Sequence, residues 1–220
     1  MKQISRILSW LVTLLIPLAL IFLGVRLVLT HAFLEVEYRM PGFPPDGYGF
    51  SIQDRLHWSK ISWDYMLNSA DISFLGDLTF PDDKPLFNAR ELSHMLDVKN
   101  VVRPAFLIGY ADWIVLLVLA LWARWGGWWS AYVNGVRRGG WLTVCLVAVV
   151  GIFAAISFWQ FFTLFHKLFF TGDSWLFLYS DTLIRLFPLR FWQDLFLFIP
   201  ILIVICGLVL GLALRPKKSR

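Results

Sequence analysis

Charged residues and cysteines are scarce in this chain, and each shortage excludes a class of protein. Only 16% of the 220 residues are charged, whereas 58% are hydrophobic and 17% are aromatic. A soluble domain of this length cannot bury that much apolar surface, which excludes an ordinary soluble enzyme and a disordered chain. The two cysteines, Cys145 and Cys206, both lie inside long apolar runs. The composition therefore excludes a disulfide scaffold and indicates a membrane protein.

The common catalytic and nucleotide-binding motifs are also missing from the sequence. There is no phosphate-binding glycine loop, no His-Glu-x-x-His, no Cys-x-x-Cys pair and no Gly-x-Ser-x-Gly elbow. A hydrolase with a nucleophilic serine therefore has no local support in the sequence.

Four apolar runs are long enough to cross a bilayer, which needs about 20 apolar residues per helix. They are Leu8–Leu29, Ala105–Leu121, Trp141–Phe165 and Leu195–Leu214. The first run is longer than the apolar region of a signal peptide and no small-residue cleavage site follows it, so we expect an uncleaved anchor.

Charge is distributed unevenly around these four runs. All 15 acidic residues fall in the windows Glu35–Asp112 and Asp173–Asp194. The chain ends and the segment between the second and third runs carry only basic residues, namely Lys2, Arg6, Arg124, Arg137, Arg138, Arg215, Lys217, Lys218 and Arg220. Short basic segments stay in the cytoplasm, so both termini are expected there, in a multi-pass protein of the cell membrane. The net charge of +5 is thus an orientation signal that also suits anionic lipid, and it is not a nucleic-acid footprint.

The predicted segments follow from this alternation. They are residues 1–30 (N-terminal tail and first span), 31–104 (extracytoplasmic cap), 105–122 (second span), 123–140 (cytoplasmic basic loop), 141–166 (third span), 167–193 (extracytoplasmic interfacial loop), 194–214 (fourth span) and 215–220 (cytoplasmic basic tail).

The cap is expected to mix strands and helices. Apolar and charged residues alternate over Phe33–Arg39, which predicts a half-buried strand, and Ile72–Phe80 is expected to return as a second strand. Ser51–Asn68 has the pattern of a helix, and a short helix is expected over 89–96. The predicted fold class is an all-α membrane bundle of four transmembrane helices with a small extracytoplasmic α/β cap.

His94 is the first candidate for acid–base chemistry. Asn88 precedes Glu91 by three residues, as in a capping box that starts a helix. On that helix Arg90, Glu91 and Asp97 lie three or four residues from His94 and share its face. A carboxylate could hydrogen-bond one ring nitrogen and leave the other free as a base. The alternative is a solvated charged face that happens to include a histidine.

His166 is the second candidate, because it ends the third apolar run among several phenylalanines. Partial burial would lower its pKa and keep the ring neutral, hence usable as a base. Interfacial anchoring is the alternative, since aromatic belts are normal at a membrane surface. The other two histidines, His31 and His57, have no suggestive setting.

Three further residues lie near the start of the second span. Asp112 follows Tyr110 at a depth where a carboxylate is either functional or near enough to the surface to reach water. Arg103 lies at the same edge and could pair with Asp112 or with a lipid phosphate.

A metal site formed by His94 and His166 with Asp97 or Asp173 is chemically plausible, but no spacing in the sequence requires it.

Three ordered motifs resemble one family, the bacterial lipoprotein intramolecular transacylases (Lit). They are Pro85–Lys99, Phe165–Phe170 followed by Asp173 and Trp175, and Asp46–Ser51 with Asp54–Leu56. The resemblance covers nearly the whole chain and includes the four spans.

The resemblance implies an enzyme that moves the sn-2 acyl chain of a diacylglyceryl-cysteine lipoprotein to the α-amine of its N-terminal cysteine. It implies His94 and His166 as the catalytic pair and requires no cofactor, metal or ATP. Its partners would be diacylglyceryl-modified lipoproteins and membrane lipid. An aromatic enclosure from Phe162, Phe165, Phe169 and Trp175 is expected. The full set of supporting or substrate-binding candidates is Arg90, Glu91, Asp97, Arg103, Tyr110, Asp112, Phe165, Asp173 and Trp175.

Two rival functions stay open at this point. A non-enzymatic envelope protein would tolerate loss of both histidines. A lipid-ester hydrolase using the same histidines would release free fatty acid. A transporter has less support, because the second span is short and few polar groups lie within the spans.

Overall fold

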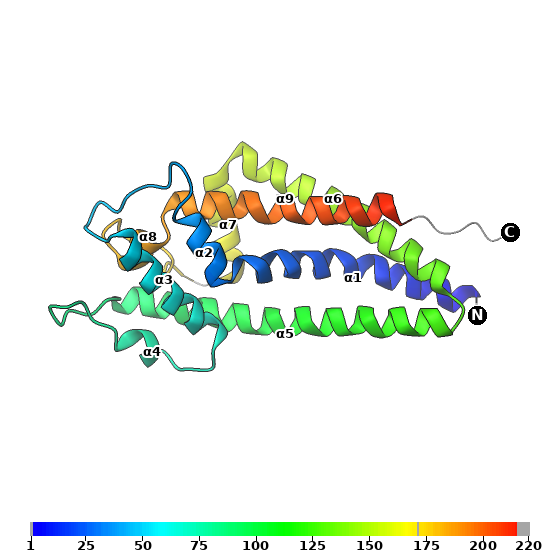
Figure 1. Ribbon diagram of the computed structural model, residues 1–220, viewed down its shortest axis with the longest axis horizontal. Coiled ribbons are helices and arrows are strands. Elements are labelled where there is room, and N and C mark those ends of the chain that lie inside the picture. The colour runs from blue at the N-terminus through cyan, green and yellow to red at the C-terminus, as the bar shows by residue number, and fades with distance from the viewer. Residues whose placement is uncertain (1, 171, 215–220) are drawn as a thin grey trace. The chain divides into compact units, whose positions relative to one another are not determined.

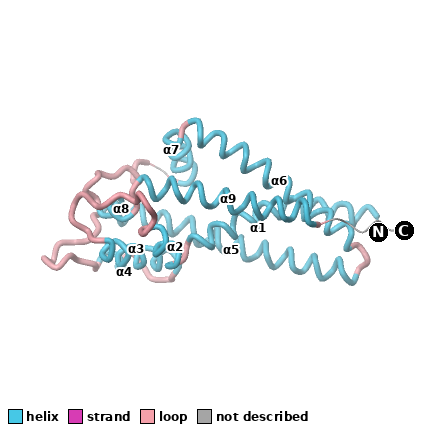
Figure 2. Tube along the Cα trace, turned by 45° about the horizontal axis from the view of Figure 1, so that its top comes forward, coloured by secondary structure: helices cyan, strands magenta, loops and turns pink. Residues whose placement is uncertain are grey.

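The computed structural model describes residues 2–170 and 172–214, in which helices are joined by turns and loops (Figures 1 and 2). The helices are α1 (Lys2–Val28), α2 (His31–Glu37), α3 (Ile52–Leu67), α4 (Ser73–Gly76), α5 (Ala89–Trp125), α6 (Trp129–Ile156), α7 (Phe158–Phe169), α8 (Thr182–Leu186) and α9 (Leu189–Ala213). The predicted basic tail, 215–220, lies outside the described residues, as do Met1 and Thr171.

The four predicted spans correspond to four long apolar helices. Helices α1, α5, α6 and α9 are each long and apolar enough to cross a membrane, which confirms a four-helix membrane protein. The helix predicted over 89–96 and the second span are one continuous helix, α5, of 37 residues. At 1.5 Å per residue it is about 55 Å long, well beyond the roughly 30 Å of a hydrocarbon core. The charged residues of its first part extend to Arg103, which agrees with the prediction that the second span begins at residue 105.

The predicted α/β cap is wrong, because the described residues contain no strand beyond an isolated bridge between Thr79 and Pro85. The segment Phe33–Arg39 lies mainly in α2, which begins where the Thr30 side chain accepts a hydrogen bond from Phe33 N. A strand with alternating faces would bury Val36 together with Leu34 and Tyr38. Val36 is instead 63% exposed, and the buried residues are Leu34, Glu37 and Tyr38. Spacings of three and four residues define a helical face.

The second predicted strand, Ile72–Phe80, is also wrong. Ser73–Gly76 forms the single turn α4, and Asp71 Oδ1 accepts hydrogen bonds from Ser73 N at 2.9 Å and from Ser73 Oγ at 2.6 Å. Such local bonds from an aspartate side chain start turns in preference to strands. Helix α3 confirms the helix predicted over Ser51–Asn68, with a complete capping box between Ser51 and Asp54.

The apolar run Trp141–Phe165 is not one helix. Helix α6 begins earlier, at Trp129, and ends at Ile156. Ser157 has an extended backbone (φ −154°, ψ 96°) and its hydroxyl accepts a hydrogen bond from Gln160 N, which starts α7 as a separate helix. His166 therefore belongs to α7 and does not end the third span.

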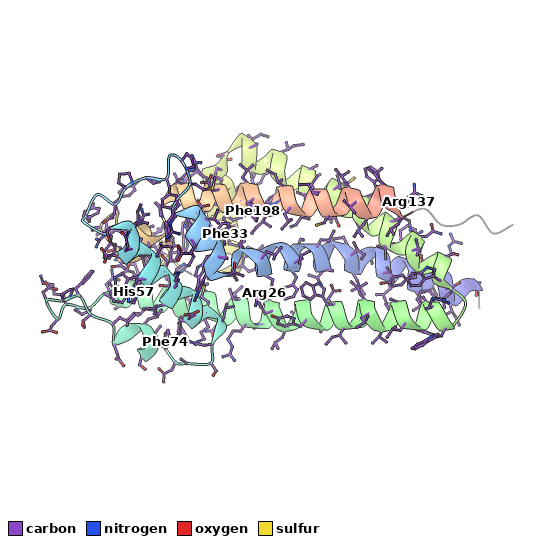
Figure 3. All side chains as sticks on the ribbon, viewed as in Figure 1. Arg26, Phe33, His57, Phe74, Arg137 and Phe198 are labelled. Atoms are coloured by element: carbon purple, nitrogen blue, oxygen red, sulfur yellow. The ribbon has the colours of Figure 1, made fainter. Side chains whose placement is uncertain are left out.

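The chain divides into two compact units. The bundle unit comprises residues 2–26, 106–156 and 197–214, with a core of aliphatic side chains that includes Val12, Ile16, Leu116 and Ile203. A Cβ on Gly139 of α6 would collide with the Cβ of Ile16 on α1, so this glycine is needed for close helix packing. Figure 3 labels Arg26, Arg137 and Phe198 in this unit.

The site unit comprises residues 27–105 and 157–196. It holds α2, α3, α4, α7, α8 and the first parts of α5 and α9. Its core is richer in aromatic rings than that of the bundle unit and includes Tyr38, Trp63, Phe187 and Phe191. Both candidate histidines, His94 and His166, lie in this unit.

Candidate active site

The capping box at the start of α5 fixes the backbone that carries His94. Asn88 Oδ1 accepts a hydrogen bond from Glu91 N at 3.1 Å, and Glu91 Oε2 accepts one from Asn88 N at 2.7 Å. The other Glu91 oxygen accepts a bond from Leu183 N of α8 at 2.7 Å. Glu91 is 1% exposed, so this carboxylate joins α5 to α8. Of the two alternatives left open for this face of α5, a hydrogen bond from Glu91 to His94 is not the one observed.

His94 lies in an almost wholly apolar setting. It is 9% exposed, and its Nδ1 is buried without a hydrogen-bond partner among the described residues. The rings of Phe170 and Phe177 lie with their centroids 5.1 and 5.3 Å from that of His94. Burial, assisted by the neighbouring His166, lowers the pKa of His94 to about 4. The imidazole is therefore neutral at physiological pH.

His166, on α7, has one ring nitrogen committed. Its Nδ1 lies 2.8 Å from the carbonyl oxygen of Phe162. A carbonyl only accepts, so Nδ1 carries the proton and donates, and Nε2 keeps its lone pair. The side chain is 7% exposed, and burial lowers its pKa below the ordinary value of 6.5. A neutral ring with a free Nε2 is a competent general base.

The two histidines are neighbours in space although 72 residues separate them in the sequence. Their ring centroids are 6.2 Å apart, with the ring planes inclined by 23°. One bound group could therefore contact both rings. Acid–base chemistry from two positions on the same reacting centre needs this arrangement.

A cavity of about 270 Å³ opens beside the two histidine rings. Its aromatic lining consists of Trp63, Trp159, Phe162, Trp175, Phe177, Tyr179, Phe187 and Trp192, and aliphatic side chains complete most of the wall. A cavity with such an apolar lining suits acyl chains. Of the four aromatic residues expected to enclose the site, Phe162 and Trp175 line the cavity, whereas Phe165 and Phe169 are not part of its wall.

Three of the supporting candidates fasten the segment 172–177 beside the cavity. Arg90 Nη1 donates to Leu176 O at 3.1 Å, and Asp97 Oδ2 accepts from Ser174 Oγ at 3.2 Å. Trp175 Nε1 donates to Gly172 O at 3.2 Å. Asp173 contributes its backbone carbonyl to Leu176 N. Arg90 and Asp97 thus act on loop position and not directly on a histidine. Trp175 does both, because its ring centroid also lies 4.9 Å from that of His166.

The other candidates do not line the cavity. Arg103 is exposed on α5. In the bundle unit, Tyr110 Oη accepts a hydrogen bond from Arg26 Nε at 3.3 Å. Asp112 is 4% exposed, and neither of its carboxylate oxygens has a hydrogen-bond partner among the described residues.

His31 and His57 lie outside the cavity, and the cavity histidines are not joined by further metal ligands among the described residues. His31 pairs with Asp64 at 2.8 Å, and His57, labelled in Figure 3, packs against Trp58. Within residues 2–170 and 172–214 no three His, Cys, Asp or Glu side chains come together as metal ligands would, so His94 and His166 do not gain Asp97 or Asp173 as partners.

Helix α8 is the part of the site that sequence reasoning missed. Leu183 and Ile184 of this five-residue helix line the cavity. Arg185 pairs with Asp46 at 3.0 Å, and the two side chains are only 10% and 2% exposed. The guanidinium also lies 3.6 Å from the ring centroid of Phe50. The Asp46 motif was noticed in the sequence, but no local signal identified Arg185 as its partner.

Comparison with known proteins gives one consistent result. The model of the family described as lipoprotein intramolecular transacylase Lit matches residues 10–192. An uncharacterized protein of Aquifex aeolicus (strain VF5) is 30% identical over 220 residues, covering 97% of this chain and 96% of that protein.

Solved structures have the same fold. The structure of the membrane integral lipoprotein intramolecular transacylase Lit from Bacillus cereus has a TM-score of 0.74 at 19% identity, covering 96% of this chain and 94% of that chain. A variant of that protein with a histidine replaced by arginine has a TM-score of 0.67 at 16% identity, covering 95% and 89%.

Proposed function

Because the chain belongs to the lipoprotein intramolecular transacylase (Lit) family and is therefore a membrane-integral acyltransferase, we propose that it acts on diacylglyceryl-cysteine lipoproteins. It transfers the sn-2 acyl chain from the glycerol to the α-amine of the N-terminal cysteine, giving an N-acyl lipoprotein in the lyso form. The observation that carries this proposal is the pair of buried, neutral imidazoles with centroids 6.2 Å apart beside an apolar cavity.

The proton transfers that this reaction requires can be divided between two histidines with different properties. An α-ammonium group has a reference pKa of about 7.7–8.0, so a neutral imidazole deprotonates it at modest cost. His166 is assigned this role, because its Nε2 lone pair is free and the Phe162 carbonyl, bonded to Nδ1–H, stabilises the imidazolium that forms. The amine nitrogen then attacks the ester carbonyl carbon and gives a tetrahedral oxyanion.

His94 is assigned to the oxyanion. Its pKa of about 4 makes it a poor base, but a neutral imidazole N–H still donates a hydrogen bond to developing negative charge. When the intermediate collapses, the bond between the acyl carbon and the glycerol oxygen breaks, and the His166 imidazolium protonates that oxygen. The nitrogen loses its second proton through His166 to solvent, so the amide and the free hydroxyl form with one proton released.

The apolar wall makes two further contributions. It holds the ester and the amine of one flexible molecule together, which offsets the entropy of bringing them into contact. It also keeps water from the tetrahedral intermediate, so that acyl transfer to the amine wins over hydrolysis. Both reacting groups belong to the substrate and both protons move through the His166 imidazole, so the proposed reaction needs no cofactor.

Tandem mass spectrometry of a lipoprotein's N-terminal lipopeptide tests the proposal. The host makes diacylglyceryl lipoproteins and lacks its own N-acylation enzyme, and it expresses the wild-type chain, His94→Ala, His166→Ala or the control His57→Ala. We expect an acyl group on the amine at unchanged total mass with wild type and His57→Ala, and its loss with either cavity variant at equal protein level. Release of one acyl chain would instead indicate an ester hydrolase, and an unmodified amine with well-expressed wild type would refute acyl transfer on this substrate.

We also propose that residues 31–104 and 167–193 lie outside the cell membrane and that both termini are cytoplasmic. The support is the confinement of acidic residues to the windows 35–112 and 173–194, since basic loops are retained inside. This orientation presents His94 and His166 to the leaflet in which extracytoplasmic lipoproteins are anchored.

A further inference from the structure

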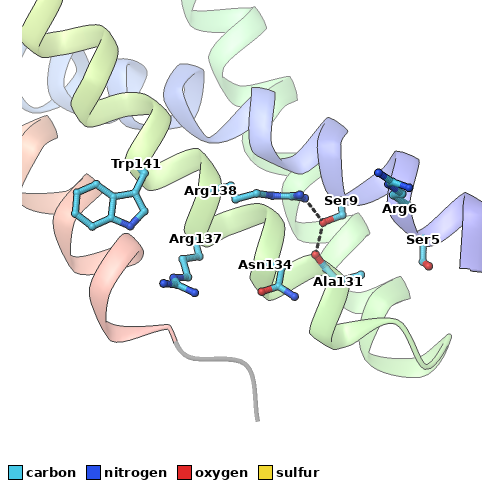
Figure 4. A pocket seen from close by; sticks show the side chains of 8 residues that line it. All are labelled: Ser5, Arg6, Ser9, Ala131, Asn134, Arg137, Arg138 and Trp141. Carbon is cyan, nitrogen blue, oxygen red and sulfur yellow. Dashed lines mark hydrogen bonds between the residues drawn. The ribbon is translucent and has the colours of Figure 1, made fainter. Parts of the chain in front are cut away.

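The bundle unit has an open groove that shares no lining residue with the histidine cavity. It measures about 580 Å³ and lies between the first turns of α1 and the first half of α6. Its polar lining includes Arg6 and Ser9 from α1 and Asn134, Arg137 and Arg138 from α6, with Trp141 at one side (Figure 4).

Neutral partners hold the guanidinium groups of this groove. Arg138 reaches from α6 to α1, where its Nη2 donates to Ser9 Oγ at 2.7 Å and its guanidinium lies 4.1 Å from the ring centroid of Trp10 (Figure 4 shows the first contact). Its Nε is buried and has no hydrogen-bond partner among the described residues. Arg137 Nε donates to the carbonyl of Gly211 at 3.1 Å. Hydrogen bonds therefore hold the guanidinium groups of Arg137 and Arg138 in place, and the Nε–H of Arg138 is left without an acceptor among the described residues.

Within the described residues, no carboxylate pairs with the arginines of this groove. Across residues 2–26, 106–156 and 197–214, the sequence has a single acidic residue, Asp112. None of the ion pairs within the described residues involves Arg6, Arg137 or Arg138. In the site unit, by contrast, Arg39, Arg185 and Arg190 each pair with an acid. A cluster of cations without counter-charge attracts an anion from outside the chain.

We propose that this groove binds the phosphate group of an anionic phospholipid. Planar guanidinium groups match the oxygens of a phosphate, to which they donate paired hydrogen bonds. Helices α1 and α6 are both candidate membrane spans, and basic pockets between such helices are where anionic head groups bind.

A lipid suits the groove better than free phosphate because of the apolar surface around it. Ile4 and Ile7 of α1 are 58% and 68% exposed, so an acyl chain has side chains to lie against. Trp10 and Trp141 flank the arginines and are 51% and 40% exposed. Exposed tryptophans next to basic residues are typical of the level of the lipid head groups.

Binding to the purified full chain in detergent micelles tests the proposal, with native mass spectrometry to count bound lipid. The probes are phosphatidylglycerol, zwitterionic phosphatidylcholine and inorganic phosphate. The variants are Arg6→Gln and Arg137→Gln in the groove. The matched control is Arg124→Gln, an exposed arginine of the same unit that does not line the groove. Thermal unfolding without added lipid checks that every variant is folded.

We expect wild type and Arg124→Gln to retain phosphatidylglycerol in preference to phosphatidylcholine. Each groove variant should weaken that binding by about fivefold, the usual effect of one basic residue near an anionic membrane. Equal binding by the groove variants and Arg124→Gln would overturn the site. Displacement of the lipid by inorganic phosphate at equal concentration would overturn the lipid assignment in favour of free phosphate. The assay contains no lipoprotein, so its outcome is independent of acyl transfer.

Discussion

The two cavity histidines are buried to a similar degree but differ in their hydrogen bonds. His166 Nδ1 is tied to Phe162 O, whereas the buried Nδ1 of His94 has no partner within the described residues. Burial disfavours the charged form of both rings, and the carbonyl at His166 partly restores it. This difference separates a ring suited to take up a proton from a ring suited to donate a hydrogen bond while neutral.

The first prediction concerns the pH dependence of acyl transfer. The general base must be neutral, and the pKa of His166 lies below the ordinary 6.5. Protonation therefore removes activity only as the pH falls below 6.5, and activity persists where an exposed histidine would already be half protonated. The measurement is kcat/KM against pH for the purified enzyme in mixed micelles. An acid limb centred at or above about 6.5 would contradict a buried base.

Sequence reasoning selected the two cavity histidines out of four, but it left the role of Glu91 open. The spacing of three residues between Glu91 and His94 allowed a hydrogen bond between them as one of two alternatives. Both carboxylate oxygens are instead occupied by backbone donors from Asn88 and Leu183. The bond to Leu183 spans 92 residues, and helical spacing holds no information about a competitor so distant in sequence.

At the scale of helices, the sequence predicted where some helices begin but not which segments form strands or where a long helix breaks. The capping pattern at Asn88 predicted the start of α5, and the residue pattern over Ser51–Asn68 predicted the extent of α3. The strand predicted over Phe33–Arg39 is wrong because a segment of seven residues can fit both an alternating and a helical pattern. The exposure of Val36 and the burial of Glu37 distinguish the two. The break at Ser157 was missed because one serine in an apolar run resembles an ordinary span residue.

A second prediction concerns helix α8, which the Asp46–Arg185 pair fastens. Arg185→Leu leaves the carboxylate of Asp46, 2% exposed, buried without its cation. Breaking a buried pair in this way costs about 3–5 kcal/mol. We therefore expect a large loss of thermal stability in detergent micelles. We also expect a fall in kcat/KM, because Leu183 and Ile184 of α8 line the cavity.

Two companion variants make that prediction specific. Lys84→Ala removes the exposed pair with Asp82, whose side chains are 77% and 54% exposed, and should leave the melting temperature almost unchanged. Asp46→Asn combined with Arg185→Leu removes both charges and should recover part of the lost stability. If the double variant were as unstable as Arg185→Leu alone, an unpaired carboxylate would not be the cause.

For the whole molecule, charge and chemistry are divided between the two units. The site unit holds fourteen of the fifteen acidic residues and both cavity histidines, whereas the bundle unit holds only Asp112 and a groove of unpaired arginines. An insertion machinery that retains basic segments reads this asymmetry during synthesis. In the proposals made above, the division that orients the chain also places catalysis and anion binding in different units.

The orientation is the last prediction, and thiol labelling of intact cells tests it. Cys145 and Cys206 are first replaced by alanine. A single cysteine is then introduced by Asp82→Cys in the site unit or by Ser130→Cys in the first helical turn of α6. Both positions are exposed. An extracytoplasmic site unit predicts that a membrane-impermeant maleimide labels the Asp82→Cys chain in intact cells. The Ser130→Cys chain should be labelled only after the membrane is opened, because Arg124, Arg137 and Arg138 hold that turn in the cytoplasm. The reverse pattern would place the histidine cavity on the cytoplasmic side, where no translocated lipoprotein could reach it.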